Sequence, residues 1–249
     1  MHNKKVIAAV TAAASLFAIV PALAQTPGGG AGTGAAFCKS LPSLMTKIGG
    51  NVTARQQKIT DHKAQVTTKR TDHWATQDAN LSAKRSTADT NRANKYAELN
   101  AKATTDAQKA AVATFQASVD AAVVARKASV DAAVNAYRDG IDAAIAAHAS
   151  ALSTAQTALQ TSVNAATSQA QSDCAADSAN GATIASTMRG SIQSAELTFK
   201  TARQDSRLEG TRKTLATTRH ESITAAMTTF KAALEAARVT LKASLTTTP

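Results

Sequence analysis

An eleven-residue repeat dominates the middle of the chain. From Ser118 the sequence divides into consecutive elevens, which begin SVDAAVVARKA, SVDAAVNAYRD and GIDAAIAAHAS. A branched apolar residue recurs at the second position of each, from Val119 to Val163. Eleven residues make three turns at about 3.67 residues per turn, so the stripe stays on one face of a nearly straight helix. The repeat therefore predicts one amphipathic helix over residues 106–174.

A second apolar stripe of the same period lies upstream. It runs from Ile48 to Leu99 and includes the paired elevens TDHKAQVTTKR and TDHWATQDANL. Its phase does not continue into the stripe that starts at Val112, and Thr104-Thr105-Asp106 supplies residues that favour a helix N-cap. We expect a turn near residues 100–107 and a long antiparallel helical hairpin over residues 38–176. One continuous helix is the alternative, because neither Gly nor Pro marks the turn.

The N-terminus has the layout of a secretory signal peptide. Lys4 and Lys5 precede an apolar run, and Ala22-Leu23-Ala24 offers small residues before Gln25. We predict cleavage between Ala24 and Gln25, a flexible Gly-rich leader over residues 25–37, and an extracytoplasmic location in the periplasm or at the cell surface. No later segment has the length and hydropathy of a transmembrane helix, so none is expected in the mature chain.

The two cysteines fit the register of the hairpin. Pairing residues whose numbers add to 211 brings the stripes together, for example Tyr96 with Phe115 and Leu99 with Val112. Cys38 and Cys174 were not used to find this register, yet their numbers add to 212. Since disulfides form outside the cytoplasm, we predict a Cys38–Cys174 disulfide. Two free or intermolecular thiols are the alternative.

The C-terminal part, residues 177–249, contains one or two further helices. Asn180-Gly181 marks a turn, and Gly210-Thr211 resembles a helix stop followed by a new N-cap. A fold near residues 205–211 would pair Ile184 with Phe230, which predicts a second, shorter hairpin. A single kinked third helix is the competing interpretation. The expected fold class is therefore all-α, with no strand.

Charge is unevenly distributed between the two arms. Residues 51–103 carry ten basic and five acidic side chains, whereas residues 104–176 carry four basic and six acidic ones. Complementary pairing of the arms explains this asymmetry, and attraction to an anionic envelope polymer or lipid headgroups is the functional alternative. The candidate polyanion-contacting residues are Lys63, Lys69, Arg70, Lys84, Arg85, Arg92 and Lys95.

The sequence offers little for catalysis or for metal binding. His62 and His73 are eleven residues apart, about 16 Å along a helix, so one metal ion cannot join them. Asp120, Asp131 and Asp142 have the same spacing and are interpreted as solvated residues beside the apolar stripe. With aromatic residues at 3% of the chain and no nucleophile or phosphate-loop motif, we expect no catalytic site, no cofactor and no metal.

The chain resembles a set of uncharacterised secreted, alanine-rich helical proteins of bacteria. The features shared are the signal peptide, a cysteine near the mature N-terminus, the ATTDAQKAAVATF segment from Ala103 to Phe115, the SVDAAV elevens and Cys174. The resemblance implies a long-helix fold and no known activity. A looser resemblance links the chain to the Skp/OmpH periplasmic chaperones, which are basic, exported and built on helical hairpins. No segment here matches their β-rich trimerisation body.

Three functional hypotheses follow. The leading one is a non-enzymatic extracytoplasmic helical rod that serves as a structural, scaffold or interaction protein of the cell envelope. A periplasmic holdase-type chaperone and a protein that binds an anionic membrane surface or polyanion are the alternatives. Self-association is also expected, because a thin helical hairpin buries little of its own surface.

Overall fold

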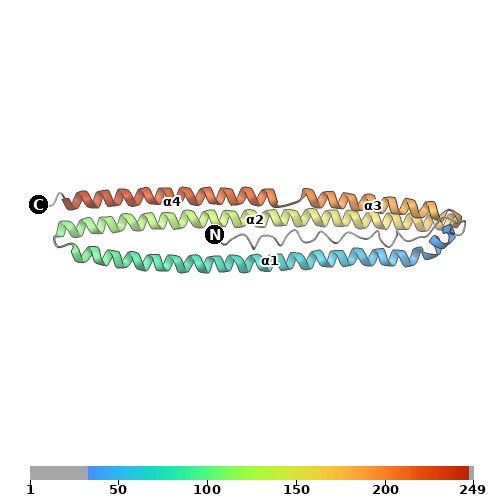
Figure 1. The fold of residues 1–249 in the computed structure, drawn as a ribbon, viewed down its shortest axis with the longest axis horizontal. Helices are drawn as coiled ribbons and strands as arrows, with labels where there is room; N and C mark the ends of the chain where they lie inside the picture. Colours follow the sequence, from blue (N-terminus) through green and yellow to red (C-terminus); the bar gives the residue numbers. More distant parts are fainter. Residues whose placement is uncertain (1–32, 247–249) are drawn as a thin grey trace. The chain divides into compact units, whose positions relative to one another are not determined.

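The computed structural model describes residues 33–246, and in this range the chain is all-α, without strands. The helices are α1 (Thr33–Lys102), α2 (Asp106–Ala176), the short 3-10 helix η4 (Ser178–Asn180), α3 (Gly181–Asp205) and α4 (Glu209–Thr246) (Figure 1). The expected fold class is confirmed. The signal peptide predicted over residues 1–24 and residues 25–32 of the predicted leader lie outside the described residues.

The turn between α1 and α2 occupies residues 103–105, inside the range that the sequence predicts. Thr105 caps α2, because its Oγ1 accepts a hydrogen bond from the Gln108 backbone N–H at 3.2 Å. The Gln108 side chain reaches back and accepts bonds from the backbone N–H groups of Thr104 (2.9 Å) and Thr105 (3.3 Å). This reciprocal capping box ends the run of helix without Gly or Pro, so the one-helix alternative is wrong.

The chain forms two compact units, and neither is a continuous segment. Unit 1 combines residues up to Thr68 with Ala149–Arg207, and unit 2 combines Lys69–His148 with the residues from Leu208 onward. In each unit a part of α1 packs antiparallel to a part of α2, and one C-terminal helix joins them. The C-terminal part named from the sequence is therefore shared between the two units, which divide after Arg207.

The core of unit 1 is built from all three of its helices. Ile48 and Val52 of α1 lie in one cluster with Leu159 and Val163 of α2, the partners that the register predicts. The third side is α3, whose apolar stripe contributes the buried residues Ile184, Met188, Ile192 and Phe199. Side chains at this spacing share one helix face, which explains why α3 packs on the hairpin.

Unit 2 has a smaller core of mostly small side chains. Val119 and Val123 of α2 and Ala237 of α4 are its buried centre, with Tyr96, Phe115, Phe230 and Leu234 packed around them. The Tyr96 and Phe115 rings meet edge to face with centroids 6.5 Å apart, as the predicted register requires. Gly140 of α2 lies under Leu215 of α4, so α4 runs antiparallel to α2.

The preferred prediction for the C-terminal part, a second hairpin, is wrong. Ile184 belongs to the core of unit 1 and Phe230 to the core of unit 2, so these two residues do not pair. The chain instead leaves helix geometry at residues 206–208 and continues as α4, which matches the kinked third helix. Gly210 is the second residue of α4 and neither ends a helix nor precedes an N-cap at Thr211.

Residues 33–37, which were assigned to the leader, form the first turn of α1. Gly34 and Gly181 approach each other so closely that a Cβ on either would overlap the backbone of the other segment. Gly34 and Gly181 therefore allow the close packing of α1 against the start of α3.

Candidate functional site

The eleven-spaced aspartates of α2 face arginines of α1 in unit 2. Arg85 binds Asp131 through both carboxylate oxygens, at 2.7 and 3.0 Å. Arg92 Nε lies 2.8 Å from the Asp120 carboxylate, and Arg70 lies 2.9 Å from the Asp142 carboxylate. The aspartates are half-exposed beside the apolar stripe, as expected, and are in addition partners of arginines in a charged seam.

Two further pairs cross the same seam with the opposite polarity. Here the acid is on α1 and the base on α2, eleven residues apart on each helix. Arg138 binds Asp78 through two bonds of 2.6 and 2.9 Å, and Lys127 lies 2.7 Å from Asp89. Alternating polarity of this kind favours one register and one direction of the two helices.

The seam perturbs the titration of its members. Hydrogen bonds from Lys127 and then Arg92 lower the pKa of Asp89, and the bond from Arg138 lowers that of Asp78. Burial, followed by the hydrogen bond to Asp120, raises the pKa of Tyr96 to about 12. Since their pKa values are lowered, Asp78 and Asp89 are ionised at neutral pH and form charged pairs with their basic partners.

The structure separates the seven predicted polyanion-contacting residues into two groups. Arg70, Arg85 and Arg92 are engaged with aspartates in the α1–α2 seam. The four lysines are exposed. Of these, Lys95 pairs with Glu98 on its own helix at 2.8 Å, and no ion pair involves Lys63, Lys69 or Lys84 among the described residues.

Aromatic side chains serve helix packing and are covered by arginines. The guanidinium groups of Arg70 and Arg138 both lie near the Trp74 ring, with their central carbons 5.1 and 5.4 Å from its centroid. Arg219 of α4 similarly covers Tyr137 of α2 at 4.3 Å. Such cation–π contacts join neighbouring helices while leaving the charge near water.

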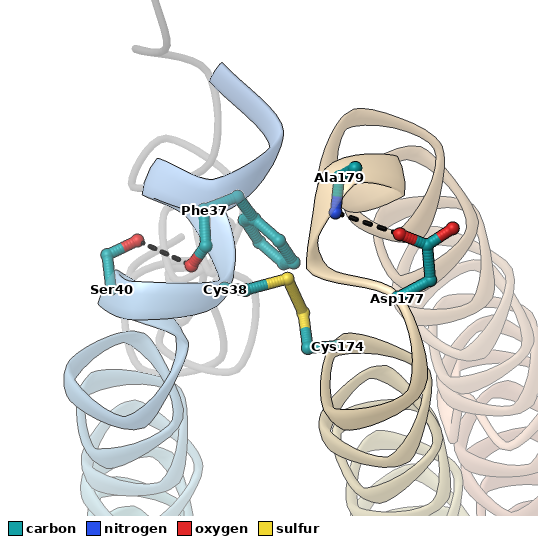
Figure 2. Close-up of a disulfide and its surroundings, with 6 residues drawn as sticks. All are labelled: Phe37, Cys38, Ser40, Cys174, Asp177 and Ala179. Atoms are coloured by element: carbon teal, nitrogen blue, oxygen red, sulfur yellow. Dashed lines mark hydrogen bonds between the residues drawn. A yellow bond between two sulfur atoms is a disulfide. The ribbon is translucent and has the colours of Figure 1, made fainter. Parts of the chain in front are cut away.

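Unit 1 contains the predicted disulfide. Cys38 of α1 is bonded to Cys174 of α2, with Cα atoms 5.5 Å apart. The buried Phe37 ring lies beside the bond, and Asp177 caps η4 by accepting a 3.0 Å bond from the Ala179 N–H (Figure 2). The staple therefore lies where α1 begins and α2 ends.

A charged contact in unit 1 was not found by sequence reasoning. Arg55 is only 7% exposed, lies 3.9 Å from Glu196 of α3, and covers the Phe199 ring at 5.6 Å. Burial lowers the pKa of Arg55 and raises that of Glu196. Arg55 shares the apolar stripe with Val52 and Ile59, and that position was its only signal in the sequence.

Within residues 33–246, no group of three or more His, Cys, Asp or Glu side chains could hold a metal ion. His62 and His73 are both exposed, and His73 contacts Gln77 on its own helix. None of the described helices combines the length and hydropathy needed to cross a membrane.

The chain matches no family model, no curated protein and no solved structure.

Proposed function

We propose that this chain is a non-enzymatic extracytoplasmic scaffold or interaction protein of the cell envelope. The observation that carries the proposal is that charged and aromatic side chains of the chain contact one another between helices. In unit 2 the arginines, aspartates and aromatic residues of α1 and α2 bind one another across the helix seam. These groups fix the register of the helices, which is a structural task, and the exposed faces remain for partners.

The location rests on two features. The N-terminal sequence has the layout of a signal peptide, and the disulfide requires an oxidising compartment. Cell fractionation with mass mapping under non-reducing conditions tests this. We expect a mature N-terminus at Gln25 and Cys38 linked to Cys174 in the extracytoplasmic fraction. Full-length cytoplasmic protein with free thiols would refute the proposal.

The scaffold role is tested by photocrosslinking in living cells. A photoreactive residue at the exposed position Thr87 should crosslink to envelope components, whereas one at Ile192, which is fully buried, should not. The absence of crosslinks from a panel of exposed positions on all the helices would contradict an interaction role.

A further inference from the structure

Unit 2 carries two matched rows of exposed basic residues, one on α1 and one on α4. In both rows the spacing is eleven residues, and the order is histidine, lysine, lysine. Each α4 member follows its α1 counterpart by the same number of positions. The three pairs are His73 with His220, Lys84 with Lys231, and Lys95 with Lys242.

The members of each pair lie at nearly the same height. Arg92 of α1 faces Asp120 of α2, while Arg126 and Tyr137 of α2 lie against Phe230 and Arg219 of α4. α4 therefore runs antiparallel to α2 and parallel to α1. These contacts place a residue of α1 level with the α4 residue about 144 positions later, so the paired basic residues are offset by only about 5 Å along the axis.

Both rows turn away from α2. On α1, Lys84 lies about 120° around the helix from Asp78, which binds α2. On α4, Lys231 lies about 120° in the opposite sense from Arg219, which also contacts α2.

The contacts of α2 fix the hand of the packing. Asp120 and Asp131 bind α1 from one flank of α2, and Tyr137 and Gly140 meet α4 from the other flank. With this hand, opposite rotations on two parallel helices turn both rows toward the same side of unit 2, between α1 and α4 and away from α2.

The two rows differ in their charges from the α1–α2 seam. Across that seam each base meets an acid, whereas the rows on α1 and α4 place basic residues at matching heights. No ion pair involves Lys84, Lys231 or Lys242 within residues 33–246, and Lys95 pairs only with Glu98. An anion placed between the two rows would be attracted by both of them.

We propose that these rows bind a linear, phosphate-bearing polyanion lying between them, parallel to α1 and α4. Successive pairs are about 16 Å apart, which suits an extended chain rather than a compact anion. Lysine binds phosphate as a point charge, and release of counterions from the polymer drives such binding. Thr87, Ala88 and Asn91 share the helix face of the row between Lys84 and Lys95, and all three are small or polar. The α1 row therefore lacks the large apolar side chains of a membrane-adsorbing helix.

The inference names a partner class for the scaffold proposed above and rests on that proposal only for its cellular setting. Binding is measured with purified, oxidised protein, so a failure of binding does not affect the fractionation and crosslinking results. The probe is linear inorganic polyphosphate, titrated by fluorescence anisotropy at several salt concentrations.

The test variant replaces Lys84, Lys95, Lys231 and Lys242 with Gln. The matched control replaces four exposed lysines of unit 1 with Gln and so removes the same net charge: Lys39, Lys47, Lys58 and Lys63. Because all eight side chains are exposed, both variants should keep the wild-type helicity and Tm, which circular dichroism checks.

We expect the wild-type protein to bind with a steep salt dependence. The test variant should lose at least about ten-fold in affinity, and the magnitude of its log K against log salt slope should fall by about 3. The control variant should change much less.

Equal losses in both variants would overturn the proposal, because net charge alone would then explain binding. Failure of the wild type to bind polyphosphate would overturn it as well. So would binding to anionic phospholipid vesicles without binding to polyphosphate, since the rows would then recognise a lipid surface.

Discussion

Removal of the Cys38–Cys174 disulfide should weaken unit 1 severely. The two cysteines are 136 residues apart, and in the chain-entropy model a closed loop of this size stabilises the folded state by about 5 kcal/mol. If unit 2 stays folded while unit 1 unfolds, only about 55 residues of the loop become free, and the model then gives about 4 kcal/mol. Either value is a large part of the roughly 5–15 kcal/mol that stabilises a typical domain.

The assay is urea unfolding of the Cys38→Ser/Cys174→Ser variant and of the oxidised wild type. Far-UV circular dichroism follows all helices, and the fluorescence of Trp74 reports on unit 2. We expect the free energy of unfolding of unit 1 to fall by about 4 kcal/mol. Wild type with reductant should match the variant, and the variant should not respond to reductant. A loss below about 1 kcal/mol would refute the loop-entropy reasoning.

Three other outcomes are expected. Gly181→Ala should destabilise unit 1 by about 1–3 kcal/mol, because the new methyl group would overlap the α1 backbone. Gly190→Ala, which has open space around it, should stabilise unit 1 by up to about 1 kcal/mol. Thermal melts would show these opposite signs, and equal signs would contradict the close approach of Gly181 to α1. Phe199→Ala should lower the free energy of unfolding by about 3–5 kcal/mol, because Phe199 is buried. Leu197→Ala, at an exposed position nearby, should lower it by less than about 0.5 kcal/mol. Similar urea midpoints for both variants would contradict the described core. Basic partners lower the pKa of Asp89 in the folded state, so its stabilising effect is present above pH 3.8 and is lost as pH falls through the folded pKa. Asp89→Asn should therefore reduce the acid sensitivity of the urea midpoint. An unchanged pH profile would count against the charged seam.

The sequence predicted the hairpin and its staple because both depend on a period and a register. A repeat of eleven residues fixes the face of each helix, and the phase break between Leu99 and Val112 locates the turn. The register then follows from the stripes, and Cys38 and Cys174 supply an independent check. Because the chain has only two cysteines, their agreement with the register of the stripes is the strongest check on that register.

The packing of the C-terminal helices could not be derived in the same way. Stripes of Ala, Ile, Met and Leu are complementary to almost any similar stripe, so Ile184 matched Phe230 in a register that the fold does not use. Complementary pairing of the arms was expected from their charges, and Arg70, Arg85 and Arg92 do pair with aspartates of α2. Their individual partners could not be named, because a basic residue on an apolar stripe does not indicate which acid it will meet. The His220–Lys231–Lys242 row could have been found, since its spacing repeats that of α1.

The repeat has a cost in folding, since an eleven-residue slip of α2 along α1 would bring Arg85 opposite Asp142 and Arg92 opposite Asp131. Such a misaligned hairpin keeps part of its charge pairing and its apolar stripe, so these contacts discriminate less strongly against it than against a slip that is not a multiple of eleven residues. It would also move the Cys38 and Cys174 thiols about 16 Å apart, beyond the reach of a disulfide. Disulfide formation therefore selects the native register, because only a hairpin aligned in that register can form the Cys38–Cys174 bond.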